Sequence, residues 1–392
     1  MGVPGYIPIR PTAGPTSIVR VSVPHRTPGP IPVLLLLMAC SHSAPVPTGP
    51  GEPGGPFSPA QPTPLTLSSF DDIHPATSGA GYISYQFRRG TPDRDLCAGI
   101  LPDRGGQRVA EVCAWELDDL SRSDLFGAAV LLGEDRLAFT RHEGGLGSPA
   151  PSDGGLYVGS ARFPRTATRV LTLLDRPTGA SARWDLLVDP RQTGPDEITA
   201  LASQWVIGPT VAFGPPDTVL VGVEIAQINL ATTPASITVI APAPGAVAWA
   251  LDPVDGAYYF LRPTYAPPAD SLFKPVADTI FLASGTTTVP IYGRPTVPNT
   301  IGGRLDGFAI HGGRLFVARR WFEFPTVGPR ILQTASQVAE VVDGVDRLPF
   351  GSRLGPNGDR WERLAITADG SGLIAESILG NARDLVRFEV DP

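Results

Sequence analysis

The chain has very little lysine, and its overall charge is negative. Lys274 is the single lysine among the 31 lysine and arginine residues, a bias that we attribute to genomic base composition and not to phosphate recognition. The formal net charge of -7 provides no electrostatic footprint for nucleic acid or an anionic lipid surface. We therefore expect no nucleic-acid partner.

Motifs that carry catalysis or bind metals are also missing from the sequence. There is no Gly-x-Ser-x-Gly elbow, His-Glu-x-x-His pair, Cys-x-x-Cys pair or P-loop. Histidine is scarce, and beyond the first 39 residues it occurs only at four scattered positions: His42, His74, His142 and His311. We expect no metal site and no cofactor, and the sequence names no catalytic residue.

The acidic residues favour structural roles. The adjacent acids Asp71 and Asp72, like the 118–119 pair, are interpreted as solvated loop charges. Asp252 and Asp255 could bind calcium, but side chains that form turns are far commoner in such a position. We therefore assign both to a turn.

One apolar run, residues 31–40, ends in Leu37-Met38-Ala39-Cys40 and is followed by small polar residues. The run is too short to span a bilayer of ~30 Å as a helix but suits the hydrophobic part of a signal peptide. It resembles a bacterial lipoprotein signal with its lipobox. That resemblance implies cleavage before Cys40, lipidation of its thiol and export to the periplasm, outer membrane or cell surface.

Three segments follow from this interpretation. Residues 1–39 form the signal peptide, whose long proline-rich start suggests that translation begins nearer Val21 or Val23. Residues 40–64 contain the lipidated cysteine and a Pro/Gly-rich tether. The proline-rich part, 44–64, cannot bury a core and is expected to be a semi-rigid arm that reaches roughly 60 Å at ~3.1 Å per residue. Residues 65–392 form the folded domain.

The two remaining cysteines, Cys97 and Cys113, flank a predicted hairpin with apolar arms around an Asp-Arg-Gly-Gly turn. If the hairpin is centred on Gly105, the two cysteines lie opposite each other, where Cβ atoms are ~4.5–5.5 Å apart. The sequence therefore predicts a disulfide between them, and two buried free thiols are the alternative.

The folded domain lacks helical periodicity and repeats one unit, an apolar strand, a tight turn and a second apolar strand. The copies lie at 129–139, 211–221, 248–260, 308–317 and 364–375, with a weaker one at 73–85. In chain order, starting from the weaker copy, each of the first five copies is followed by a second pair of strands. These pairs are expected at 96–113, 156–174, 225–240, 279–292 and 331–342. Such radial repetition predicts an all-β propeller of six four-stranded blades.

The last unit is one strand short, and residues 65–70 can supply that strand, closing the ring. Seven blades remain an alternative because 80 residues separate two of the copies, and a pair of β-sandwiches is another. The turns Thr367-Ala-Asp-Gly370 and Asp252-Pro-Val-Asp-Gly256 are similar to those of TolB-like and WD40-like six-bladed propellers. The resemblance implies an architecture and no chemistry.

Long connections are expected on one face of the propeller, because the links between second and third strands and between blades emerge together. They include 88–94, 142–155, 175–204, 262–277 and 319–330. Function prefers elaborated loops on a rigid scaffold, and Trp, Tyr and Arg dominate the hot spots of interfaces. The candidate binding residues on this long-loop face are Arg88, Arg89, Arg141, Tyr265, Arg320, Trp321, Phe322 and Phe324, together with His142, Trp184, Phe273 and Arg319.

Two functions fit these observations. The first is a lipid-anchored, non-enzymatic scaffold that binds an envelope protein or peptide on the long-loop face. The alternative is a propeller enzyme, a hydrolase or lyase acting on a glycan or lactone in the central channel. An enzyme needs several convergent acids or histidines, whereas the proposed innermost strands are mostly apolar, so the first function is favoured.

Overall fold

The computed structural model describes residues 62–66, 72–78, 81–88, 96–113, 125–142, 154–172, 181–207, 218–265, 275–295, 302–323, 332–354, 359–380 and 382–391. All of them belong to one compact unit, 48–392, and a second unit spans residues 1–47. The lipobox, Cys40 and the tether up to Gln61 lie outside the described residues. Within those residues, no helix has the length and hydrophobicity needed to cross a bilayer.

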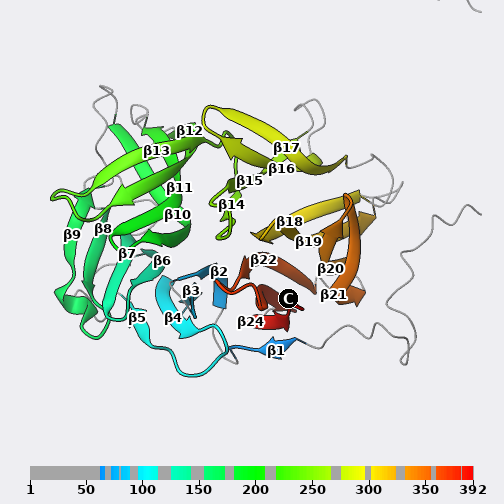
Figure 1. Ribbon diagram of the computed structural model, residues 1–392, viewed down its shortest axis with the longest axis horizontal. Helices are drawn as coiled ribbons and strands as arrows, with labels where there is room; N and C mark the ends of the chain where they lie inside the picture. The colour runs from blue at the N-terminus through cyan, green and yellow to red at the C-terminus, as the bar shows by residue number, and fades with distance from the viewer. Residues whose placement is uncertain are drawn as a thin grey trace, which may run out of the picture. The chain divides into compact units, whose positions relative to one another are not determined.

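Six four-stranded antiparallel meanders form the blades of a β-propeller (Figure 1), and one parallel pairing, Leu96 with Leu125, joins the sheets of the first two blades. Blade 1 contains β2 (Asp72–Thr77), β3 (Tyr82–Arg88), β4 (Leu96–Pro102) and β5 (Ala110–Val112). Blade 2 contains β6 (Leu125–Leu132), β7 (Arg136–His142), β8 (Gly154–Ser160) and β9 (Thr168–Thr172), with a short 3-10 helix at Pro164–Thr166. Blade 3 contains β10 (Ser181–Gly194), β11 (Glu197–Ile207), β12 (Thr218–Asn229) and β13 (Ser236–Pro242).

The remaining three blades follow the same meander. Blade 4 contains β14 (Ala248–Leu251), β15 (Tyr258–Tyr265), β16 (Pro275–Ser284) and β17 (Thr287–Pro295). Blade 5 contains β18 (Gly302–His311), β19 (Arg314–Glu323), β20 (Leu332–Val342) and β21 (Val345–Leu354). Blade 6 contains β22 (Arg360–Ile366), β23 (Gly372–Leu379), β24 (Ala382–Glu389) and β1 (Thr63–Pro64).

The predicted six-bladed fold is confirmed, including its closure by an N-terminal strand. β1 pairs with β24 as the outermost strand of blade 6, and the amides of Leu65 and Thr66 extend the contact to the carbonyl of Leu385. The closing strand thus begins two residues earlier than the predicted 65–70, of which 67–70 lie outside the described residues.

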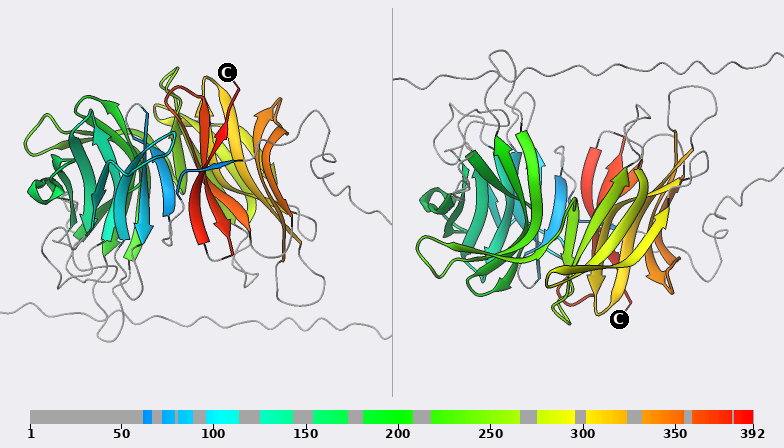
Figure 2. Two further views of the ribbon diagram at one scale, coloured as in Figure 1. Left: turned by 90° about the horizontal axis from the view of Figure 1, so that it is seen from below. Right: turned by 90° about the horizontal axis from the view of Figure 1, so that it is seen from above.

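Six hydrophobic clusters hold the ring together, one at each junction between adjacent blades. They are the 1–2, 2–3, 3–4, 4–5, 5–6 and 6–1 junctions. Leu65 packs in the last of these, with Ile374 and Leu385 of blade 6 and Ile83 and Tyr85 of blade 1. Central strands contact a neighbour on both faces, and accordingly β23 is buried at every residue except its last. Figure 2 shows the blades from the side, as twisted sheets standing next to one another.

Two predicted strand pairs were wrong. Residues 211–221 do not form the inner hairpin of blade 3, because β12 begins at Thr218 and is the third strand. The inner hairpin is β10–β11, which occupies the predicted 175–204 connection. The predicted pair at 331–342 is instead the single strand β20, which begins at Leu332, and its partner β21 follows at Val345.

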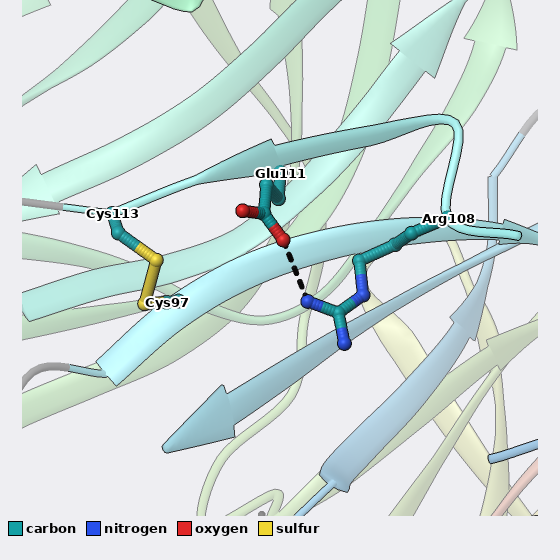
Figure 3. The surroundings of a disulfide bond; sticks show 4 residues. All are labelled: Cys97, Arg108, Glu111 and Cys113. Carbon is teal, nitrogen blue, oxygen red and sulfur yellow. Dashed lines mark hydrogen bonds and ion pairs between the residues drawn. A yellow bond between two sulfur atoms is a disulfide. The ribbon is translucent and has the colours of Figure 1, made fainter. Parts of the chain in front are cut away.

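A disulfide joins Cys97 on β4 to Cys113, which follows β5 (Figure 3). Ala98 pairs with Val112 in these strands, which is the register expected for a hairpin centred on Gly105. An ion pair between Arg108 and Glu111, 2.6 Å from Nη1 to Oε2, lies in the same hairpin. Both cysteines are fully buried between blades 6 and 1.

Candidate functional site

The predicted long-loop residues that the structure describes lie on strands. Arg88, Arg141 and Tyr265 are at the ends of second strands, and Trp184 is on the innermost strand β10. These second strands run in the same direction in their blades and end on one face of the propeller. Arg89, Phe273 and Phe324 lie outside the described residues. For Arg88, Arg141, His142, Trp184, Tyr265 and Phe322 only the backbone is described.

The predicted 319–330 connection begins later than expected, because β19 continues to Glu323. Arg319 is buried, and its Nη2 donates a hydrogen bond to the hydroxyl of Tyr292 at 2.9 Å. Its guanidinium carbon lies 5.9 Å from the ring centre of Trp321. Arg319 therefore lies in a strand and contributes to the junction between blades 4 and 5, so its prediction as a loop residue was wrong.

Polar side chains gather instead on the innermost strands, which surround the centre of the ring in Figure 1. Irregular pairing interrupts these strands at the same level in blades 1, 5 and 6: at His74, Asp306 and Arg363. β6 and β10 carry comparable irregularities. Since bulges redirect side chains and are frequent beside functional sites, this ring of bulges marks the channel as a candidate site.

Contacts between strands show that these bulges are level. Gly307, next to Asp306, lies so close to Arg363 that an added Cβ would come within 2.7 Å of the Arg363 Cα. The Thr77 hydroxyl donates to the carbonyl of Ile366 at 2.5 Å, which aligns the ends of β2 and β22. His74 and Arg363 both have left-handed backbones, with φ of 55° and 45°. Such strain persists where the surroundings enforce it.

The first part of this polar network joins blades 5 and 6. Arg320, which the sequence placed in a binding loop, donates from Nη2 to Asp306 Oδ1 at 2.6 Å. Its Nη1 lies 3.8 Å from Glu362 Oε1, and Glu362 also pairs with Arg360. Burial raises the pKa of Asp306 to about 6 despite the charge of Arg320. Burial would also raise the pKa of Glu362, but the hydrogen bond and charge of Arg360 lower it.

The second part joins blades 6 and 1. Glu376 on β23 is fully buried, accepts a hydrogen bond from Arg383 at 2.8 Å and another from the His74 amide at 3.3 Å. Burial, followed by the negative charge of Glu362, raises the pKa of Glu376. Burial, with the positive charges of Arg363 and Arg383, lowers the pKa of His74 to about 3. The imidazole is therefore neutral at physiological pH.

Asp72 lies in β2, the strand that also contains His74, and its position differs from the one expected. The sequence interpreted it as a solvated loop charge, but it lies in β2 and is fully buried. Asp71 and the 118–119 pair lie outside the described residues. In the part of the chain that the structure describes, no three acids, histidines or cysteines are arranged to hold a metal ion.

A cavity of about 650 Å³ lies on the face of the ring opposite the long-loop face. Its wall is formed where the innermost strand of a blade turns into the second strand. We call this end of the ring the turn face. Five blades contribute to the wall, which consists of Thr77, Leu132, Gly133, Arg136, Arg191, Gln192, Thr193, Gly194, Pro195, Leu251, Pro253, Ile366 and Ala368. Ligand sites typically measure ~300–1,000 Å³, so the cavity can accommodate a small molecule or the end of a peptide.

The hairpin β10–β11 supplies five consecutive wall residues, 191–195, and this contribution was missed in the sequence. β10 is long, and its pairing with β11 is irregular just before Arg191 and again between Gln192 and Gly194. A signal for this hairpin was present, since Gly194-Pro195-Asp196 is a turn between two apolar segments.

Arg191 is fixed by contacts that cross from blade 3 to blade 4. Its guanidinium carbon lies 4.9 Å from the ring centre of Trp249, and its Nη2 is 3.5 Å from the Trp249 carbonyl. Arg191 is 6% exposed and Trp249 1%, so this cation–π contact is formed largely out of water. The second charged wall residue, Arg136, is half exposed and pairs with Asp196 at 2.5 Å.

Hydrogen bonds between turns stiffen the rim. The buried carboxylate of Asp252 accepts from the amides of Gly312 and Gly313 in blade 5 at 2.8 and 2.7 Å, and from Val254 at 3.0 Å. Burial alone would raise the pKa of Asp252, but these backbone donors outweigh it and lower the pKa. Asp255 accepts from the Ala257 amide within the same turn. Both aspartates thus occupy turn positions, as predicted.

Comparison with known proteins does not assign the chain to a family. No protein-family model and no curated protein matches the chain. Similar solved structures include an ulvan lyase, 12% identical with a TM-score of 0.45 over 84% of this chain and 96% of that one. A luciferin-regenerating enzyme is 10% identical, with a TM-score of 0.42 over 84% and 92%. A gluconolactonase from Xanthomonas campestris is 14% identical, with a TM-score of 0.41 over 86% and 99%. Likeness at this level carries no argument about activity.

Proposed function

We propose that this protein is an exported, lipid-anchored, TolB-like propeller that binds a ligand without chemical conversion, and that its binding site is the turn-face cavity. The observation that carries the proposal is the cavity wall, which five blades build and whose rim Asp252 braces by hydrogen bonds between turns. A site on such rigid elements holds its ligand with little loss of conformational entropy.

The ligand has the size of a small molecule or of the terminal residues of an envelope peptide. The sequence favoured a protein or peptide partner on the long-loop face. The cavity lies on the other face, where the short turns between first and second strands emerge. A lipidated Cys40 followed by a Pro/Gly-rich tether of roughly 60 Å would leave this face accessible to partners in the periplasm or at the cell surface.

The proposal is tested with a panel of small molecules and short peptides, screened by thermal shift against the full chain in detergent. Ala368 is exposed on the rim, so Ala368→Trp should fill the cavity without disturbing the core. Ala231→Trp, at an exposed position outside the cavity wall, is the matched control. We expect hits that bind wild type and Ala231→Trp and are lost in Ala368→Trp. Hits that survive in Ala368→Trp, or a panel without hits, would contradict the proposal.

A second candidate function is catalysis in the channel on a glycan or lactone. The observation that favours it is the convergence of Asp306, Glu362, Glu376 and His74 where blades 5, 6 and 1 meet. The pKa of Asp306 is raised to about 6 and that of Glu362 is lowered, as in an acid and base pair. Against it, each carboxylate already has an arginine partner.

This candidate predicts turnover of an aldonolactone or a uronic-acid oligosaccharide, with a rate that falls as the pH rises through about 6 and Asp306 loses its proton. Asp306→Asn should lower that rate at least ~100-fold. Equal rates in the variant and wild type, or no turnover by wild type, would eliminate it.

A further inference from the structure

The charged groups on the wall of the turn-face cavity are all of one sign. Arg136 and Arg191 contribute guanidinium groups, and none of the described wall residues is acidic. Asp196, the partner of Arg136, is half exposed and lies beyond the wall. The cavity therefore favours a ligand with negative charge.

The two arginines can each contribute to binding a negatively charged ligand, in different ways. Arg191 is held by Trp249, so its guanidinium is oriented before a ligand arrives. A preorganised guanidinium loses little entropy when it binds a planar carboxylate. Arg136 pairs with Asp196 at the surface, where an ion pair contributes little to stability. Arg136 can therefore turn to a ligand at small cost.

The rest of the wall is uncharged and mostly apolar. Aliphatic and ring carbons come from Leu132, Leu251, Ile366, Pro195 and Pro253, and neutral polar groups from Thr77, Gln192 and Thr193. Such a wall stabilises an apolar body by removing it from water, at ~25 cal/mol per Å². It supplies few donors beyond the two arginines, which suits a monoanion better than a phosphate dianion.

We infer that the turn-face cavity binds a carboxylate carried on an apolar body, an inference that rests on the proposed binding function. The carboxylate can belong to a free organic acid or to the C-terminal residue of a partner peptide. In both cases the charged end contacts Arg191 and Arg136, and the apolar part lies against the leucines, Ile366 and the prolines of the wall.

The test compares matched ligands by isothermal titration against the full chain in detergent. The free-acid arm uses 4-phenylbutyrate and its neutral amide, and the peptide arm uses a hexapeptide ending in phenylalanine with a free or amidated C-terminus. We expect at least one carboxylate to bind, its amide to bind about 10- to 100-fold more weakly, and added salt to weaken the carboxylate. The arm that shows the difference identifies the source.

Variants assign the effect to the cavity. Arg136→Gln should weaken the carboxylate about 10-fold and leave its amide unchanged. Arg162→Gln is the control, because Arg162 is an exposed arginine paired with Asp135 and lies outside the wall. Arg191→Gln should act more strongly, and its thermal midpoint is measured beside wild type because the residue is buried.

The outcomes separate the two claims. Amides that bind as tightly as the carboxylates and are lost in Ala368→Trp would leave the binding function standing and overturn the carboxylate inference. Carboxylates that bind Ala368→Trp as tightly as wild type would overturn both claims. A preference for the carboxylate that persists unchanged in Arg136→Gln and in a folded Arg191→Gln would also overturn the inference.

Discussion

His74 and Asp306 illustrate what a bulge does to a single side chain. Each lies at a bulge, where the inner strand has one residue more than the strand with which it pairs. The sequence does not reveal these bulges, because a bulge depends on the register between two strands and on the blade that faces them. The sequence analysis therefore gave His74 and Asp306 no role in a site. It assigned Asp252 and Asp255 correctly to a turn, because each accepts a hydrogen bond from an amide two residues further along the chain.

The depressed pKa of His74 makes stability depend on pH. The folded pKa of about 3 lies below the unfolded value of 6.5, so the unfolded chain binds more protons between these values. Stability is thus retained above pH 6.5 and falls as the pH decreases. His74→Asn removes this titration and suits the left-handed backbone. From pH 7 to 4 we expect the variant to lose less stability than wild type, by about 3 kcal/mol, measured by urea unfolding. Equal losses would contradict the assignment.

Gly307 is required by packing between blades 5 and 6. A Cβ at this position would come within 2.7 Å of the Arg363 Cα and 2.8 Å of its nitrogen, both of which are backbone atoms. Gly307→Ala should therefore destabilise the protein by about 1–3 kcal/mol. Gly222→Ala is the control, because an added Cβ there meets nothing within 4 Å. Similar denaturation midpoints for the two variants would show that blades 5 and 6 are not packed this closely.

The inner hairpins were predictable where the turn is short and rich in glycine or aspartate. The 248–260 and 364–375 units were found because Asp252, Gly256, Asp369 and Gly370 fix the turn by local hydrogen bonds and positive φ. The β10–β11 hairpin was assigned to a connection because β10 is 14 residues long and irregular near its end. That irregular segment forms much of the cavity wall. Because the sequence analysis assigned it to a connection, it did not predict the cavity.

The turn of blade 4 stabilises its neighbour through Asp252. Asp252→Asn replaces one acceptor oxygen by a donor that faces the amides of Gly312 and Gly313, and should cost about 2–3 kcal/mol in the free energy of unfolding. Asp255→Asn alters an exposed carboxylate in the same turn and should cost less than about 1 kcal/mol. Equal urea midpoints for the two variants would indicate that the contact between blades is unimportant.

For the molecule as a whole, the sequence predicted the ring and its closure because both depend on the number and order of strands. The cavity could not be predicted, since its wall is assembled from residues of five blades that are far apart in the chain. The same limit applied to the channel network, which combines Asp306, Glu362, Glu376 and His74 from three blades.

Anchoring remains a prediction from the lipobox and is tested in cells. A full chain expressed in a bacterial host with labelled palmitate should incorporate the label and fractionate with membranes. Cys40→Ser should lose the label and leave the lipid-anchored fraction, because no thiol remains for acylation. A chain that stays in the membrane fraction in both forms, without label, would contradict a lipid anchor at this cysteine.

The central claim is that binding takes place in the turn-face cavity. A crystal structure of the full chain with a bound hit from the ligand panel tests it most directly. We predict density for the ligand between Arg191 and Pro253, with its charged end toward the guanidinium groups of Arg191 and Arg136. Density on the long-loop face, or beside Asp306 and Glu362 in the channel, with the cavity filled only by water, would contradict the account.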